Sequence, residues 1–267
     1  MLLTLDGRVA LITGGSRGIG AATAGLLGAA GASIVVTYRN SEAEVRALVS
    51  DLQGKGIEAE MVRSDIAVDP EVAVDAAIAA FGRLDILVSN AGIRSPGEPV
   101  VSTPRDVLEH SLAIHAVGPH QLVRAALPHL RRHERSDVVF ISSAATKTFR
   151  PTAAPYAMGK AAVEALARTL AREERQNGVR VNIVAPGIVD TTMGRDALSR
   201  LGMTDAEALV DAPFGRVCTA DDVARVVEFL VGEGGSYLTE QRIFVDGGGL
   251  AGTWLPRSDR AMDTSTE

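Results

Sequence analysis

Short runs of apolar residues alternate with longer segments in which apolar residues recur at helical spacing. Apolar runs that do not alternate with polar residues are typical of parallel strands buried on both sides. Strands are expected at 8–13, 33–38, 57–63, 84–89, 137–142, 179–184 and 241–245. Helices are expected at 21–30, 42–54, 104–132, 154–176 and 221–231, with another that begins at Asp69 as N-cap and Pro70. This alternation predicts an α/β fold, a doubly wound parallel sheet with helices on both faces.

The alternation stops over residues 190–215, where apolar and polar residues mix without strand character. Such a long excursion in a compact domain is usually functional, so we expect a lid over the substrate there. No tandem repeat or linker divides the chain, and we therefore expect one domain over residues 1–250. The polar segment 251–267 is expected to be a mobile tail.

Composition narrows the function classes. The formal net charge of −6 over 267 residues argues against a nucleic-acid-binding surface. The single cysteine, Cys218, leaves no disulfide framework, and His129 and His133 lie among arginines rather than carboxylates, so no metal site is expected. The first residues lack the pattern of a secretory signal, and no apolar run reaches membrane-span length. We expect a cytoplasmic protein that binds neither membrane nor nucleic acid.

A glycine-rich stretch, Gly14-Gly-Ser-Arg-Gly18-Ile-Gly20, separates the first strand from the first helix. Glycines let the backbone turn tightly and approach a pyrophosphate at the helix N-terminus, where free N–H groups favour an anion. The spacing differs from the G-x-G-x-x-G pattern, and the loop alone also suits a structural strand–helix turn. It nevertheless makes a dinucleotide the first candidate ligand.

The end of the second strand indicates which dinucleotide is bound. Arg39 and Asn40 stand where an NAD-binding protein usually has an acidic residue for the ribose 2′-hydroxyl. An arginine at this point suits a 2′-phosphate, and Arg17 in the glycine loop is placed to reach the same group. Both arginines are also compatible with ordinary surface positions. Their paired placement favours NADP(H).

A third group of residues suggests proton transfer. Ser143 follows an apolar run, and Tyr156 and Lys160 are spaced i, i+4 on an expected helix, so their side chains share a face. An ammonium beside a phenol is expected to lower the phenol pKa, which allows proton exchange nearer to neutral pH. Tyr-x-x-x-Lys is common on helices, and a half-buried tyrosine beside a solvated lysine is the plain alternative.

Taken together, these motifs resemble the classical short-chain dehydrogenase/reductases, most closely the 3-oxoacyl-carrier-protein reductase-like group, over residues 5–248. The resemblance implies a Rossmann-type single domain. It is carried by the ordered series Thr13-Gly-Gly-Ser-Arg-Gly-Ile-Gly20, Asp65-Ile66, Asn90-Ala-Gly92, Ser143 with Tyr156 and Lys160, Pro186-Gly187 with Thr191, and Val245-Asp-Gly-Gly248.

The resemblance implies a role for each motif. Tyr156 is the expected acid or base, Lys160 its partner and a ligand of the nicotinamide ribose, and Ser143 the residue that orients the carbonyl. The loop, the strand ends and the resemblance together give the expected cofactor-binding residues: Gly14, Ser16, Arg17, Gly18, Ile19, Gly20, Arg39, Asn40, Asp65, Ile66, Asn90, Ala91, Gly92, Tyr156, Lys160, Ile188 and Thr191.

The sequence departs from the family at His115, where a catalytic asparagine generally stands at a kink in the long helix. In the family, the backbone carbonyl of that asparagine holds a water that connects the lysine to solvent. His115 is therefore counted with the expected catalytic residues, as an imidazole kept neutral by Lys160. Two interpretations remain open: the imidazole takes part in the relay, or it fills space while the carbonyl acts. Glu240 is a second departure, in place of a glycine before the last strand.

We expect an NADP(H)-dependent oxidoreductase that reduces a carbonyl to a secondary alcohol or catalyses the reverse, with a 3-oxoacyl compound as one candidate substrate. The alternative within enzymes is an NAD-linked sugar, polyol or steroid dehydrogenase. An inactive dinucleotide-binding regulator would have no need of Ser143, Tyr156 and Lys160. The resemblance also implies a homo-oligomer, a tetramer or a dimer, whose interfaces use the long helix and the Tyr156 helix.

Overall fold

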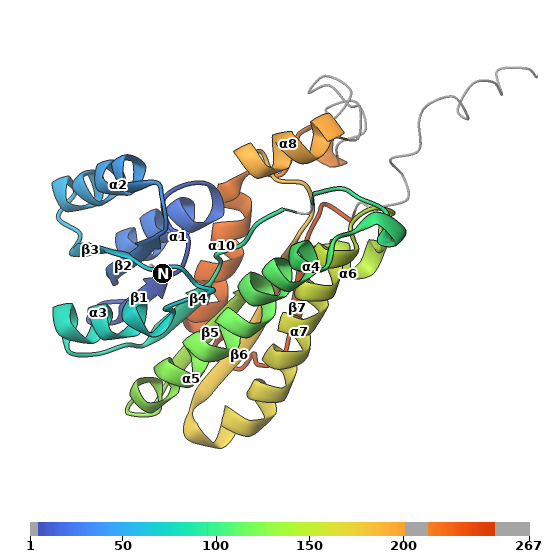
Figure 1. Ribbon diagram of the computed structural model, residues 1–267. Coiled ribbons are helices and arrows are strands. Elements are labelled where there is room, and N and C mark those ends of the chain that lie inside the picture. Colours follow the sequence, from blue (N-terminus) through green and yellow to red (C-terminus); the bar gives the residue numbers. More distant parts are fainter. Residues whose placement is uncertain (1–4, 95, 201–212, 249–267) are drawn as a thin grey trace, which may run out of the picture.

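One parallel sheet organises the molecule, and its strand order is β3-β2-β1-β4-β5-β6-β7 in the computed structural model, which describes residues 5–94, 96–200 and 213–248 (Figure 1). Each strand pairs in parallel with its neighbours, as buried apolar runs require. The strands are β1 (Val9–Ile12), β2 (Ser33–Tyr38), β3 (Ala59–Arg63), β4 (Ile86–Ser89), β5 (Ser136–Ile141), β6 (Val179–Pro186) and β7 (Arg242–Val245). The expected doubly wound fold is confirmed.

Helices connect the strands and cover both faces of the sheet (Figure 1). Their bounds are α1 (Gly18–Ala29), α2 (Glu42–Gly54), α3 (Glu71–Phe81), α4 (Arg105–Leu112), α5 (Gly118–Leu130), α6 (Ala145–Thr148), α7 (Ala154–Glu174), α8 (Thr192–Arg200) and α10 (Ala220–Val231). Helices α1, α2 and α10 pack on one face, and α3, α5 and α7 on the other. Over the described residues, no helix has both the length and the apolar character needed to cross a membrane.

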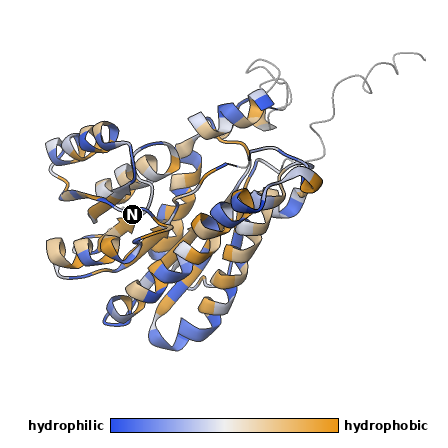
Figure 2. Cartoon of the chain, viewed as in Figure 1, coloured by the Kyte–Doolittle hydropathy of each residue, from blue (hydrophilic) through white to orange (hydrophobic). Residues whose placement is uncertain are grey.

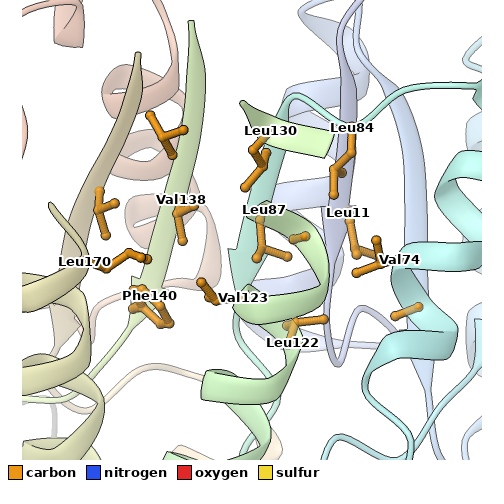
Figure 3. Packing of buried hydrophobic residues seen from close by; sticks show 14 of the residues in the cluster. Leu11, Val74, Leu84, Leu87, Leu122, Val123, Leu130, Val138, Phe140 and Leu170 are labelled. Carbon is orange, nitrogen blue, oxygen red and sulfur yellow. The ribbon is translucent and has the colours of Figure 1, made fainter. Parts of the chain in front are cut away.

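The alternation of side chains along each strand divides the core into two layers. In β1, Val9 and Leu11 face the layer under α3, α5 and α7, whereas Ala10 and Ile12 face the layer under α1, α2 and α10. Figure 3 shows the first layer, in which Phe140 of β5 lies among leucines and valines of the helices. Apolar residues accordingly concentrate on the strands and on the inner faces of the helices (Figure 2).

The strand order reverses between β1 and β4, which are neighbours in the sheet but far apart in the chain. The connections after β1 and β4 therefore leave toward opposite faces, and a crevice opens above the carboxyl ends of these strands. The glycine loop follows β1, and Asn90 follows β4. The topology thus brings both segments to the same edge of the sheet.

The expected long helix over 104–132 is broken. It consists of α4, a π-helical turn at Ala113–Val117, and α5. Pro119 has no N–H, so the carbonyl of His115, four residues earlier, has no α-helical donor. The N–H of Gly118 instead donates to the carbonyl of Ala113, five residues back. The sequence suggested a kink near His115 by resemblance alone, and the proline provides its physical cause.

One smaller expectation is also corrected, and one is left untested. Asp69 does not cap α3, because Pro70 is the N-cap, and the Asp69 carboxylate accepts from the backbone N–H of Asp65 at 2.6 Å. The expected lid over residues 190–215 stays a prediction, and its first part forms α8. The remainder of the expected lid, residues 201–212, and the expected tail, residues 251–267, lie outside the described residues.

The turn that contains Glu240 keeps the left-handed backbone that glycine favours, with φ 61°. The Glu240 N–H donates to the carbonyl of Val181 at 2.7 Å, and its carboxylate accepts two hydrogen bonds from Arg172. The turn before β7 is thus held in place although its left-handed residue carries a side chain.

Helix α7 packs against the π-helical turn through Gly159. A Cβ atom at this position would lie 2.6 Å from the Cβ of His115, a distance that real Cβ atoms do not adopt. Gly25 on α1 provides a contrast, since a Cβ there meets no atom within 4 Å. The absence of a side chain at 159 therefore makes room for the bulky residue at 115.

Replacement of these two glycines by alanine should have opposite effects on stability. Gly159→Ala is expected to lower the free energy of unfolding by about 1–3 kcal/mol, because the added methyl overpacks the helix interface. Gly25→Ala is the matched control and should raise stability by about 0.4–1 kcal/mol, because it only restricts the unfolded chain. Urea unfolding curves of both variants test this. Equal shifts of the two midpoints would show that the contact with His115 is not tight.

Candidate active site

A cleft of about 1290 Å³ lies over the carboxyl ends of the central strands. The structure brings every predicted cofactor-binding and catalytic residue to the wall of this cleft except Gly20. Segments far apart along the chain, such as the glycine loop, His115 and Ile188, therefore meet at one place. The grouping agrees with the position that ligands take in open α/β sheets.

Gly20 does not line the cleft but packs behind the glycine loop. A Cβ atom there would lie 2.4 Å from the carbonyl oxygen of Gly14 and 2.7 Å from the Asn90 amide nitrogen. Gly14 and Gly18 have φ angles of 64° and 56°, in the left-handed region. These three glycines allow the loop to turn tightly against the start of α1.

Thr13 and Asn90 connect the ends of β1 and β4. The Thr13 hydroxyl accepts from the backbone N–H groups of Asn90 and Ala91, each at 3.0 Å. The Asn90 amide donates to the carbonyls of Thr13 at 2.8 Å and Gly14 at 3.1 Å. Thr13 was not among the predicted site residues, and its position at the end of β1 was the available signal. The bonds fix the glycine loop relative to its neighbour strand.

The N-terminus of α1 is suited to an anion. Its N-cap, Arg17, has extended backbone, no side chain caps the helix, and the first turn carries no acidic residue. The first N–H groups of the helix therefore keep their donor capacity and the positive end of the helix dipole. Together with the glycine turn, this arrangement fits a dinucleotide pyrophosphate.

The predicted 2′-phosphate residues lie at the β2 side of the cleft. Arg17 and Arg39 are both exposed, and the Arg39 guanidinium Nη1 is 3.7 Å from Asp65 Oδ2. Asp65 also accepts from the N–H of Ala67 at 3.0 Å, which orients its carboxylate. Arg39 therefore has only a loose partner and keeps donors for a ligand.

Ser143, Tyr156 and Lys160 come together where β5 ends and α7 begins. Ser143 follows β5, and its hydroxyl accepts from the N–H of Ala145 at 3.1 Å. The Tyr156 ring meets the His115 ring edge-on, with centroids 5.2 Å apart. Lys160 Nζ is 5.8 Å from the centroid of the tyrosine ring and donates to the carbonyl of Ile141 at 2.7 Å.

The expected lowering of the Tyr156 pKa is wrong for this structure. Burial raises the pKa of the tyrosine, and a hydrogen bond with Ser143 opposes part of that rise. Burial also lowers the pKa of Lys160 to about 8, although Glu164 favours the charged form. The lysine Nζ donates to a backbone carbonyl and not to the tyrosine. Its charge therefore does not lower the Tyr156 pKa below the usual value, although the spacing alone suggested such a lowering.

Glu164 lies behind the site and was not among the predicted residues. Its buried carboxylate accepts from the hydroxyls of Ser142 and Thr146, both at 2.7 Å, and pairs with Arg242 at 2.8 Å. It lies one helical turn beyond Lys160, on the same face of α7. That spacing, continued from Tyr156 to Lys160 to Glu164, was the available signal. The network fixes the segment that carries Ser143.

His115 is buried, and its imidazole is neutral as expected. Burial, and then the charge of Lys160, lower its pKa to about 3. Its Nε2 is 2.9 Å from the carbonyl oxygen of Ile93, a distance that suits an Nε2–H donor. In that tautomer Nδ1 is an acceptor, and it is buried without a partner among the described residues.

His129 and His133, the two histidines spaced i, i+4 near the end of α5, are partly buried. His129 keeps a buried Nδ1 without a partner in the described residues, and His133 Nε2 is 3.7 Å from an oxygen of Asp85. Across residues 5–94, 96–200 and 213–248, no cluster of three histidine, cysteine or acidic side chains has metal-ligating geometry.

Comparison with known proteins identifies the family. A family model described as enoyl-(acyl carrier protein) reductase matches residues 14–249. An Arabidopsis thaliana NADPH-dependent aldehyde reductase-like protein is 34% identical, with 92% of this chain and 95% of the relative aligned. The chain belongs to the classical short-chain dehydrogenase/reductases.

Two solved structures show the same fold at similar identity. A short-chain dehydrogenase from Burkholderia cenocepacia in complex with NADP has a TM-score of 0.83 and 35% identity, over 91% of this chain and 98% of that one. A blue fluorescent protein from a metagenomic library, in complex with NADPH, has a TM-score of 0.85 and 34% identity, over 93% and 99%. The short-chain dehydrogenase/reductase fold thus extends over nearly the whole chain.

The pH dependence of this short-chain dehydrogenase/reductase should lack a histidine step. His115, with a pKa of about 3, stays neutral at neutral pH, whereas Lys160, with a pKa of about 8, stays charged there. We expect kcat/KM for reduction to be flat from about pH 5 to about pH 7 and to fall as Lys160 loses its proton. His115→Asn should leave this shape unchanged. An acidic limb near the reference histidine pKa of about 6.5 that disappears in His115→Asn would contradict the assignment.

Proposed function

We propose that the protein is an NADP(H)-dependent oxidoreductase that reduces a carbonyl to a secondary alcohol or catalyses the reverse reaction. The observation that carries the proposal is the convergence of Ser143, Tyr156 and Lys160 on the wall of a cleft whose other end fits a dinucleotide. A regulator that only bound a dinucleotide would have no use for these three side chains.

In the proposed reduction, Tyr156 gives its proton to the carbonyl oxygen as negative charge develops there. The raised pKa of the tyrosine keeps it protonated at neutral pH, which suits an acid. Ser143 donates a hydrogen bond to the same oxygen and orients it. The cationic Lys160 favours the phenolate that is left behind. NADPH, when bound, supplies the hydride.

The glycine loop and the start of α1 would hold the pyrophosphate, and Arg17, Arg39 and Asn40 the 2′-phosphate. Support comes from the loose ion pair of Arg39 with Asp65 and from the relatives whose names or titles include NADP or NADPH. Asp65 and Ile66 would contact the adenine, and the remaining predicted residues would contact the riboses and nicotinamide. The alternative, an NAD-linked dehydrogenase of a sugar, polyol or steroid, would leave Arg39 without a phosphate to bind.

We also propose that the enzyme is a cytoplasmic homo-oligomer. Support for the oligomer comes from large apolar side chains that are exposed on and beside helix α7. Val117 of the π-helical turn is 56% exposed, and Met158 of α7 is 49% exposed. A second copy that covers these side chains would remove apolar surface from water next to the residues that position the site.

Loss of the tyrosine hydroxyl should separate chemistry from cofactor binding. Tyr156→Phe is expected to lower kcat about 10²–10⁴-fold, because the acid is lost, while the dissociation constant for NADPH stays unchanged. Tyr237→Phe, at a fully exposed tyrosine, is the control and should be as active as the parent enzyme. The measurements are NADPH oxidation with a panel of ketones and aldehydes, and NADPH fluorescence titration. Near-normal kcat in Tyr156→Phe would refute the proposed mechanism.

Reversal of charge at Arg39 should change cofactor preference. Arg39→Asp is expected to raise KM for NADPH about 10- to 100-fold, because a charge-assisted hydrogen bond is lost and replaced by repulsion. KM for NADH should change little or fall. Arg46→Asp makes the same charge change on α2, away from the cleft, and should leave both constants unchanged. The proposal fails if the parent enzyme uses NADH as efficiently as NADPH.

A further inference from the structure

The cationic side chains of the cleft beyond the cofactor end are mostly neutralised. Arg200 donates to the carbonyl of Pro96. Beyond the cofactor end, the described arginines of the cleft with carboxylate partners are Arg94 with Asp196 at 2.6 Å, Arg195 with Asp190 at 2.6 Å and Arg216 with Asp222 at 2.5 Å. These side chains therefore offer an incoming substrate little net positive charge. These paired arginines can be compared with Arg150, whose side chain has no such partner in the described part of the chain.

Arg150 lines the same cleft and is partly buried, and its side chain has neither an ion pair nor a hydrogen bond within the described residues. Burial lowers the pKa of its guanidinium, and no neighbouring charge opposes that effect. A partly desolvated cation without a partner is costly to keep unless a ligand pairs with it. The other arginines show that this chain supplies carboxylates elsewhere along the same wall.

The backbone around Arg150 is held in a strained conformation. Phe149 and Thr152, on either side of it, have φ angles of 43° and 66°. Left-handed backbone at residues other than glycine costs energy and is concentrated at functional sites. The segment joins α6 to α7, so Arg150 lies in the chain between the predicted catalytic residues Ser143 and Tyr156. Arg150 is therefore flanked in the chain by two of the predicted catalytic residues.

The cofactor does not account for Arg150. The elements that fit its phosphates are the glycine loop after β1 and Arg39 after β2, whereas Arg150 belongs to the connection after β5. Strand β4 lies between β1 and β5 in the sheet. The anion that pairs with Arg150 must therefore come from the other ligand of the cleft.

We infer that Arg150 binds an anionic group of the substrate, so that the enzyme acts on a carbonyl compound, or the corresponding alcohol, that carries a carboxylate or a phosphate. The inference rests on the proposed function for the carbonyl chemistry. The guanidinium presents a planar fork of donors that matches two oxygens of either group. A neutral sugar, polyol or steroid has no group to fill this role.

Matched pairs of substrates test the inference directly. Benzoylformate and methyl benzoylformate share one carbonyl and differ in the charge of the neighbouring group, and dihydroxyacetone phosphate and dihydroxyacetone form the phosphate pair. With saturating NADPH, we expect kcat/KM to be about 10- to 100-fold higher for the charged member of one pair, the effect of one charge-assisted hydrogen bond. The pair that shows the preference distinguishes carboxylate from phosphate. Equal constants within both pairs would overturn the inference.

Variants assign the preference to this side chain. Arg150→Gln should lower kcat/KM for the charged substrate about 10- to 100-fold and leave the neutral one unchanged, whereas Arg150→Lys should keep part of the preference because it keeps the charge. Arg105→Gln removes an exposed arginine outside the cleft and should change neither constant. Equal losses for both members in Arg150→Gln would show a structural role and contradict the inference.

A binding measurement separates this inference from the proposed function. Calorimetry with the protein and NADP⁺ compares benzoate with benzamide and inorganic phosphate with sodium chloride, using the parent protein and Arg150→Gln. Tighter binding of benzoate or phosphate that is lost in Arg150→Gln supports the anion site even if no carbonyl compound is turned over, in which case the proposed function alone fails. No preference for either anion would overturn the inference even in an active enzyme.

Discussion

The buried ammonium of Lys160 is the constraint on which the rest of the site depends. A buried cation is costly unless it is hydrogen-bonded and compensated by charge. Here the Ile141 carbonyl accepts from Nζ, and the buried carboxylate of Glu164 favours the charged form. Glu164 in turn takes two hydroxyl hydrogen bonds and pairs with Arg242 of β7. The end of β5, helices α6 and α7, and the last strand are thus held around one charge.

The same logic explains how a histidine fits near the lysine. The imidazole is kept neutral by burial and by Lys160 itself, so no second cation has to be buried. Space for its ring comes from Gly159 on α7 and Gly92 after β4, where a Cβ would lie 2.6 Å and 2.9 Å from atoms of His115. Pro119 removes one helical donor at this turn. The backbone carbonyl of His115 stands where the family has its asparagine carbonyl. The imidazole side chain has no counterpart in that pattern.

The cleft is divided by charge as well as by shape. At the end formed by β1 and β2, helix N–H groups, Arg17 and the loosely paired Arg39 favour phosphates. At the other end most arginines have carboxylate partners on the same wall. Such pairs cancel much of the positive charge of this rim, so that Arg150, which has no ion pair within the described residues, differs from Arg94, Arg195 and Arg216.

The sequence by itself determined the parallel sheet with helices on both faces, because buried strands and helical spacing are local patterns. The glycine turn and the i, i+4 spacing also singled out part of the cleft wall, whereas residues such as Asp65, Asn90 and Ile188 were expected from the family resemblance. The sequence did not determine the break in the long helix, the raised pKa of Tyr156 or the role of Glu164. Nor did it separate Arg150 from Arg94 and Arg195. These depend on burial and on partners distant in the chain, such as Arg94 with Asp196, 102 residues apart, or Glu164 with Arg242, 78 residues apart. Only the tertiary structure fixes which charges are desolvated together, and desolvation decides their chemistry.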